Sequence, residues 1–263
     1  MIAVRALRAE LRKATALPAV WAGIAVALAG SLAITLLNSV TARGAIRAGE
    51  AEEMLADTSP YEAGFAAAPL GTVGAVIIGV VIISSEYTAN SPDAGGSRQI
   101  TTTLAAVPQR AVILLAKVLT TSGLVGLTAL VTLPACLAVA HLVMGGLGEE
   151  TVTVSEGAAR WLGAWVYWTL MGMMALAITV LTRSGIIPLI VLILNNSLVS
   201  FSFLLTLITP VAFWLPDMAG RKLFGGPDMA PGGLDLAPGA LVMLLWTLAL
   251  LAIAGVTFQR RDA

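Results

Sequence analysis

The chain has 263 residues, of which 58% are hydrophobic and only 11% are charged, and its formal net charge is zero. A soluble domain of this composition would lack the polar surface to cover itself, so the composition excludes an ordinary water-soluble protein and indicates one solvated by lipid. The balanced charge gives no reason to expect a nucleic-acid partner, and none is predicted. The single cysteine, Cys136, lies in an apolar run, which excludes an internal disulfide.

Six stretches of the sequence contain no Asp, Glu, Lys or Arg and are each long enough to cross a bilayer. They are residues 14–42, 63–85, 118–148, 161–182, 184–216 and 236–259. About 20 apolar helical residues span the hydrocarbon, and a charge at its centre costs about 2.5–3.5 kcal/mol. The sequence therefore predicts an all-α polytopic membrane protein with one membrane domain over residues 1–263. Its six predicted spans are 18–38, 66–85, 112–144, 161–182, 186–208 and 239–258.

Residues 2–13 precede the first predicted span and are rich in basic side chains. One side of a helix would hold the apolar residues Ile2, Ala6, Leu7 and Leu11. This pattern predicts an N-terminal amphipathic helix in the membrane interface; the alternative is a disordered basic tail that only sets the topology. Pro18 is expected to end the helix and to let the chain turn into the membrane.

Basic residues are unevenly distributed between alternate gaps. With six spans, ten of the fifteen Lys and Arg residues fall on the side that holds both termini. Basic residues accumulate on the cytoplasmic side of membrane proteins. The sequence therefore predicts a multi-pass protein of the cell membrane with both termini in the cytoplasm.

The longest predicted cytoplasmic segment, residues 86–117, joins the second and third spans. Its first half is rich in turn-forming residues, whereas Ser97 to Val107 predicts a short helix that starts at Ser97 and is closed by Pro108. A short helix between two spans either acts as a lever or is an ordinary polar connection.

Three short motifs follow one another around this connection. They are Glu-Tyr at 86–87, Thr-Thr-Leu-Ala-Ala-Val-Pro-Gln-Arg at 102–110 and Ala-Lys at 116–117. Together with the six-span layout and the basic N-terminal helix, they resemble the permease subunit of type-2 ABC exporters. The resemblance covers the whole chain in topology but only about thirty residues in motif, and the extra stretch 90–96 departs from shorter family members.

The resemblance implies that the second-to-third connection carries a cytoplasmic coupling helix that docks on a separate ABC ATPase subunit. It further implies that a second permease copy, in a homodimer or a heterodimer, faces the first around a substrate path. The residues expected to couple to the ATPase are Glu86, Arg98, Thr101, Thr102, Thr103, Leu104, Pro108, Arg110 and Lys117. None of the lysines follows a glycine, so the phosphate-binding G-x-x-x-x-G-K-[ST] loop is absent. The chain is therefore not expected to be an enzyme or to bind a cofactor, and ATP and magnesium would be bound by the partner.

Polar side chains interrupt the fifth predicted span, where unpaired amides would be costly in hydrocarbon. The residues predicted to line a substrate path are Asn195, Asn196, Ser197, Ser200, Phe201 and Phe203. The alternative is that the amides and hydroxyls form hydrogen bonds between helices of one subunit.

Prolines and glycines interrupt residues 209–238, which predicts a re-entrant-like outer segment of short helices between the fifth and sixth spans. The tryptophans at 161, 165 and 168 are interpreted as an aromatic belt at the outer membrane interface. No residues stand at the spacing of a metal site or a catalytic constellation, so neither is predicted.

The sequence thus predicts the transmembrane subunit of an ATP-driven exporter of a hydrophobic or amphipathic solute, such as a drug, peptide or lipid. Two alternatives stay open. An ion-coupled secondary carrier is disfavoured because the uncharged stretches hold no residue to carry coupling charge. A non-transporting membrane scaffold or immunity subunit that recruits an ATPase would share the same sequence features.

Overall fold

The computed structural model describes residues 2–50, 59–88, 99–148, 150, 152–195, 200–225 and 232–260. Within these ranges the chain is helical and contains no strand. Five helices of the described part are long and apolar enough to cross a membrane: Pro18–Ala48, Pro60–Tyr87, Arg110–Met144, Val154–Thr182 and Leu236–Arg260. The prediction of an all-α multi-pass membrane protein is confirmed at this level.

Two of the five crossing segments are built from more than one element. The first comprises α2 (Pro18–Ala25), the π-helical turn η1 (Val26–Gly30) and α3 (Ser31–Ala48). The second comprises α4 (Pro60–Phe65) and α5 (Ala68–Tyr87). The remaining three are α7 (Arg110–Met144), α8 (Val154–Thr182) and α12 (Leu236–Arg260). With 35 residues, α7 is about 52 Å long, so it extends beyond the ~30 Å hydrocarbon core of a bilayer.

The structure does not show the continuous fifth helix that hydropathy predicted over residues 186–208. The described chain forms α9 (Ile186–Asn195) and then α10 (Phe201–Thr206). The Asn195 Oδ1 atom accepts a hydrogen bond of 3.1 Å from the backbone N–H of Ser202, and Ser200 Oγ accepts one of 3.2 Å from Phe203. These side-chain oxygens cap the start of α10 and so favour a break over a continuous helix.

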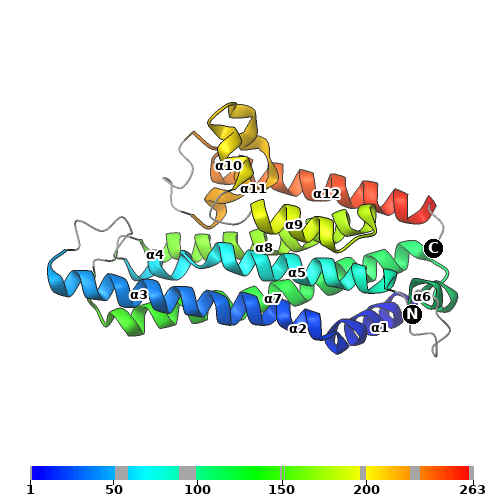
Figure 1. Ribbon diagram of the computed structural model, residues 1–263, viewed down its shortest axis with the longest axis horizontal. Coiled ribbons are helices and arrows are strands. Elements are labelled where there is room, and N and C mark those ends of the chain that lie inside the picture. The colour runs from blue at the N-terminus through cyan, green and yellow to red at the C-terminus, as the bar shows by residue number, and fades with distance from the viewer. Residues whose placement is uncertain are drawn as a thin grey trace.

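Helices α5 and α8 form the centre of the bundle, with the other long helices around them (Figure 1). They approach closely at Gly79, where a Cβ atom would overlap the carbonyl oxygen of Gly172. Nearby, Trp168 is fully buried and its indole N–H donates a 3.0 Å hydrogen bond to the Ala68 carbonyl. The belt interpretation is therefore wrong for Trp168, because this side chain packs over Gly71 in the core.

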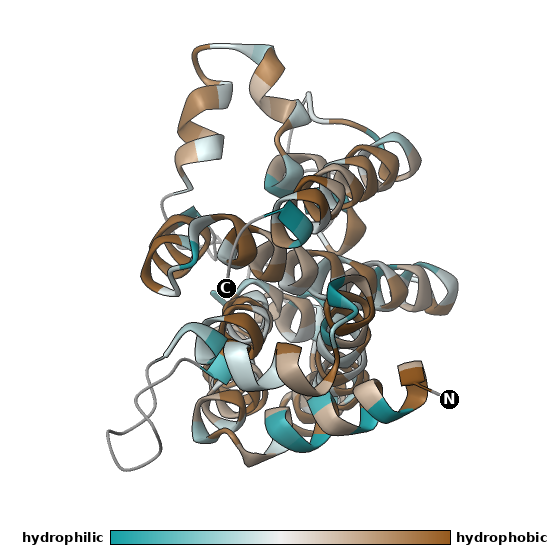
Figure 2. Ribbon diagram, turned by 90° about the vertical axis from the view of Figure 1, so that its right-hand side faces the viewer, coloured by the Kyte–Doolittle hydropathy of each residue, from teal (hydrophilic) through white to brown (hydrophobic). Residues whose placement is uncertain are grey.

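One end of the bundle holds α1 (Ile2–Ala16), α6 (Gln99–Ala106) and the end of α12 (Figures 1 and 2). The N-terminal helix is present as predicted, but its buried face is Ala6, Glu10 and Ala14. Of the residues predicted on the apolar side, Ala6 is buried and Leu7 partly buried, whereas Ile2 and Leu11 are exposed. The buried face packs on α7, where Glu10 meets the buried Lys117.

The opposite end of the bundle is held by a second group of charges. The Arg160 guanidinium of α8 pairs with both carboxylate oxygens of Glu62 in α4, and its Nε donates a 3.2 Å hydrogen bond to the Phe224 carbonyl. Phe224 directly follows three short helices, η4 (Pro210–Trp214), α11 (Pro216–Ala219) and η5 (Arg221–Leu223). The described part of the 209–238 segment is therefore composed of short helices, as predicted.

The close approach of α5 and α8 generates a test of the packing. We expect Gly79→Ala to lower the free energy of unfolding by about 1–3 kcal/mol, because the methyl group forces the two helices apart. The measurement is the thermal unfolding midpoint in detergent. Gly123→Ala in α7 is the matched control, since no neighbouring atom lies within 4 Å of the added methyl group. Equal midpoints for the two variants would contradict this account.

Candidate functional site

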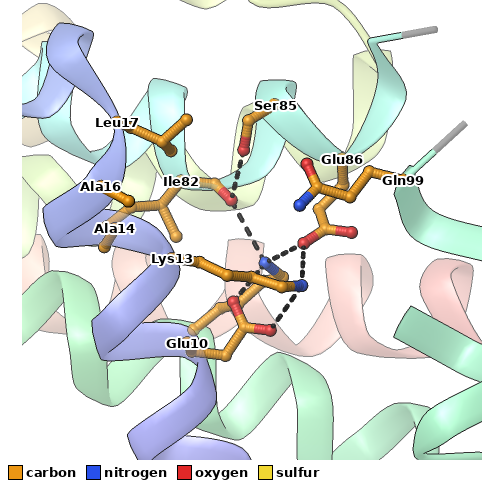
Figure 3. Close-up of a pocket in the computed structure, with 10 residues that line it drawn as sticks. Glu10, Lys13, Ala14, Ala16, Leu17, Ile82, Ser85, Glu86 and Gln99 are labelled. Atoms are coloured by element: carbon orange, nitrogen blue, oxygen red, sulfur yellow. Dashed lines mark hydrogen bonds and ion pairs between the residues drawn. The ribbon is translucent and has the colours of Figure 1, made fainter. Parts of the chain in front are cut away.

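Four charged side chains converge where α1, α5 and α7 meet, and we name Glu10, Lys13, Glu86 and Lys117 the four-charge cluster (Figure 3). Glu10, Glu86 and Lys117 are 5%, 2% and 2% exposed. The first two residues come from α1, the third from the last turn of α5 and the fourth from the second turn of α7. The cluster holds two charges of each sign and is therefore neutral as a whole.

Lys117 is the most deeply enclosed cation of the cluster. Its Nζ atom donates to Glu10 Oε2 at 2.6 Å, to Glu86 Oε1 at 2.8 Å and to the Ile82 carbonyl at 3.3 Å. An ammonium group has three N–H donors, and all three have acceptors here. The burial of this charge is compensated by two carboxylates and a carbonyl.

Lys13 joins the cluster to α6. Its Nζ atom donates to Glu86 Oε1 at 2.9 Å, to Glu10 Oε1 at 3.3 Å and to the Thr103 hydroxyl at 2.8 Å. Burial by itself lowers the pKa of the Lys13 ammonium, but the hydrogen bond and charge of Glu86, together with Glu10, outweigh this and raise the pKa. Lys13 therefore stays charged at neutral pH.

Glu86 accepts hydrogen bonds from both lysines of the cluster and from Thr103. Its Oε1 accepts from both lysines, and its Oε2 lies 2.9 Å from the Thr103 hydroxyl, which donates to it. Thr103 belongs to α6, so a single carboxylate at the end of α5 contacts side chains of α1, α6 and α7. The cluster thereby ties four helices together at one end of the bundle.

A cavity of about 180 Å³ lies beside the cluster. All four charged residues line it, together with polar groups from Ser85 and Gln99 and apolar side chains from α1 and α5. Pockets for drug-sized ligands measure roughly 300–1,000 Å³. This cavity is too small for such a solute and suits ordered water molecules that would hydrate the charges.

The residues predicted to couple to an ATPase fall into two groups. Glu86, Thr103 and Lys117 meet in the cluster. The others lie around it: Thr101 and Thr102 on the exposed face of α6, Leu104 partly buried against the core, and Pro108 exposed before α7. Arg110 begins α7 and its Nη1 donates a 3.0 Å hydrogen bond to the Phe258 carbonyl of α12. Arg98 lies outside the described residues.

Sequence reasoning missed Glu10 and Lys13 as site residues. In the sequence Lys13 is one of several basic residues near the N-terminus, and Glu10 is not singled out. The available signal was that Glu10 is the only acid in the basic segment 2–16. Nothing in the sequence identifies Lys117 as its partner.

The residues predicted to line a substrate path have varied surroundings. Asn195 and Ser200 cap α10, as described above, and Ser202 Oγ donates a 3.0 Å hydrogen bond to Asn195 Oδ1. Phe201 and Phe203 are exposed on α10. Asn196 and Ser197 lie outside the described residues. The hydrogen bonds within one chain match the alternative given for the amides and hydroxyls, while the exposed phenyl rings leave the path prediction untested.

A buried acid lies in α11, between α10 and α12. Asp217 of α11 is 5% exposed, and its Oδ2 lies 3.4 Å from the Ser200 hydroxyl. Burial raises the pKa of the Asp217 carboxyl, and the Ser202 hydroxyl, nearby backbone amides and the Arg221 guanidinium only partly offset this. The folded chain therefore favours the protonated carboxyl more strongly than the unfolded chain does.

Comparison with known proteins adds no family assignment. No protein-family model matches the chain, and no curated protein matches it in sequence.

The cluster predicts a large difference between two lysine substitutions. We expect Lys117→Met to lower the free energy of unfolding by about 3–5 kcal/mol, because it leaves buried carboxylates without their main cation. Lys222→Met, which removes a lysine paired with the exposed Asp235, should cost about 1 kcal/mol or less. Chemical denaturation in detergent measures both values.

Coupling within the cluster provides a further check on this result. Adding Glu10→Gln to Lys117→Met should cost less than the sum of the single changes, because the two side chains form one ion pair. Additive costs, or equal costs for the two methionine variants, would show that the cluster is not a coupled unit.

Asp217 predicts a pH dependence of stability. An acid whose folded pKa is raised destabilises the folded state as pH rises above its unfolded value of 3.8, where only the unfolded chain ionises freely. We expect Asp217→Asn to raise the unfolding midpoint at about pH 7 and to have little effect below that unfolded value. Thermal scans over this pH range test it, with the exposed Asp235→Asn as control. A lower midpoint for Asp217→Asn at neutral pH would contradict the assignment.

Proposed function

We propose that this chain is the transmembrane subunit of an ATP-driven exporter and that a separate ATPase subunit docks on the exposed face of α6. The observation that supports this proposal is the four-charge cluster, which links α6 and α1 to the ends of two long helices. A displacement of α6 would act on Glu86 of α5 through Thr103, and Glu86 is in turn bound to Lys117 of α7. Such a linkage suits the transfer of a mechanical signal from a surface helix to membrane spans.

The outward face of α6 suits a protein partner. Its exposed residues are Thr101, Thr102, Ala105 and Ala106, all of which have short side chains. The inward face is anchored by Ile100, which is buried, and by Leu104, which packs against the core. A second protein can therefore approach the α6 backbone closely without displacing the residues that hold the helix in place.

In this proposal α6 and both termini are cytoplasmic, and α9 with α10 forms an interrupted fifth crossing, so that the chain has six spans. The cavity beside the four-charge cluster, about 180 Å³, is too small for a drug-sized solute. The export path would lie between two copies of the chain. Phe201 and Phe203 would contribute an apolar wall to that path. ATP and magnesium would be bound by the ATPase, and the exported solute would be hydrophobic or amphipathic.

An ion-coupled carrier is the second candidate, because Glu86 and Lys117 are buried charges within helices long enough to span a membrane. The sequence argument against a carrier used the uncharged stretches, and Lys117 lies one residue before the third of these, inside α7. However, coupling sites of carriers lie near the bilayer midplane. Lys117 is seven residues from the start of α7, or about 10 Å along a helix of about 52 Å, and its donors are all used.

Co-purification in detergent with the ATPase encoded beside this chain tests the proposal. We expect the wild-type complex to survive purification and Ala105→Glu/Ala106→Glu to reduce the retained ATPase by at least about tenfold, because buried unpaired carboxylates weaken an interface by several kcal/mol. Both alanines are exposed, so these substitutions leave the core and the cluster intact.

The matched control is Ala158→Glu/Ala159→Glu, which places the same charges on two exposed adjacent alanines at the opposite end of the bundle. This control should retain the ATPase. A wild-type chain that never associates with the ATPase would overturn the exporter proposal. The ion-coupled carrier would then be the favoured function. Association without ATP-driven transport in vesicles would favour a scaffold that only recruits the ATPase.

A further inference from the structure

The outer face of α1 carries three exposed arginines, Arg5, Arg8 and Arg12. Their spacing of three and four residues keeps them within about 60° of one another around the helix, given 100° per residue. We name this row the arginine stripe. In the part of the chain that the structure describes, no hydrogen bond or ion pair involves any of the three guanidinium groups, so their charge faces outward.

The buried face of α1 explains why the stripe is uncompensated. Glu10 is the only acidic residue of the helix, and it points inward to Lys13 and Lys117. Viewed along the axis, the three arginines lie opposite Glu10, because each is two or five residues away from it. The fold therefore turns Glu10 away from the arginines and leaves three positive charges together on the exposed face of α1.

Exposed apolar side chains flank the stripe. Ile2, Val4 and Leu11 are 53%, 57% and 45% exposed, although each could have packed inward on a differently rotated helix. At the start of α2, Trp21 is 56% exposed and its indole N–H donates a 2.8 Å hydrogen bond to the Thr15 carbonyl. Figure 2 shows the alternation of hydrophilic and hydrophobic positions along α1. Basic residues beside exposed apolar residues and a tryptophan are typical of a helix at the level of lipid headgroups.

We propose that the arginine stripe binds the phosphates of anionic phospholipid headgroups. Guanidinium groups pair with phosphate oxygens in a bidentate manner, and the flanking Ile2, Val4 and Leu11 would enter the adjoining acyl region. A bilayer is the favoured occupant because α1 leads directly into the first crossing segment at Pro18, which keeps the stripe beside the membrane surface. An acidic protein segment would satisfy the charge but not the exposed apolar side chains at its edges.

Lipid on this face stabilises the rest of the site. Because α1 has the stripe on one side and Glu10 on the other, headgroups that hold the helix in place also hold Glu10 against Lys117. Anionic lipid therefore stabilises the contact of α1 with α5, α6 and α7. This inference does not depend on what the protein transports.

Lipid titration of the purified full-length chain in nonionic detergent tests the proposal. Dioleoyl phosphatidylglycerol should raise the unfolding midpoint and appear as bound lipid in native mass spectrometry, whereas dioleoyl phosphatidylcholine should do neither. Each basic residue near an anionic surface contributes roughly fivefold in affinity, so Arg5→Gln/Arg12→Gln should weaken phosphatidylglycerol binding about 25-fold. High salt should weaken binding to the wild-type chain.

Two further variants make the result specific. Arg47→Gln/Arg260→Gln removes two exposed arginines from α3 and α12 and should bind the lipid like the wild type. Arg5→Lys/Arg12→Lys keeps the charge and should bind phosphatidylglycerol more tightly than the glutamine variant does, because the attraction to the anionic surface remains. Equal binding of the two lipids, or unchanged phosphatidylglycerol binding by Arg5→Gln/Arg12→Gln, would overturn the proposal. So would a loss confined to the Arg47 and Arg260 variant.

Discussion

The four-charge cluster is the interaction on which one end of this protein depends. A buried lysine or glutamate is costly unless an opposite charge and hydrogen bonds compensate it, and here each member can be buried only if the others are present. This requirement turns Glu10 of α1 inward, brings the end of α5 beside the start of α7 and holds α6 through Thr103. The rotation of α1 in turn decides which of its residues face outward.

Different forces hold the middle and the far end of the bundle. Lipid tails are as apolar as leucine, so helices in a membrane associate through close packing and polar contacts and gain little from the hydrophobic effect. Small residues supply the close packing, as at Gly79 against Gly172. At the far end, the Arg160–Glu62 pair ties α4 to α8, and the bond from Arg160 to the Phe224 carbonyl adds the segment that follows η5. The long helices are thus secured by charge at both ends.

The segment from α9 to η5 obeys a different constraint. Interrupting a helix exposes backbone groups that have no water to bond within a bilayer, so the polar groups must be satisfied by the protein itself. Asn195, Ser200 and Ser202 meet this need by capping α10 and by bonding to one another, and Asp217 lies next to Ser200. Asn195 and Ser200, two of the residues predicted to line a substrate path, therefore have a structural role in the chain.

Hydropathy by itself determined the helical membrane class and most of the long helices, because the absence of charge over about 20 residues is a local property of the chain. Helical periodicity likewise predicted α1, and the start and stop signals at Ser97 and Pro108 predicted the helix that contains α6. The cluster was decided only by the tertiary structure, since Lys117 and Glu10 are 107 positions apart and nothing local identifies the pair. The same holds for the buried face of α1, for Trp168 in the core and for the break after α9. Each depends on which groups of distant helices come within hydrogen-bond or packing distance.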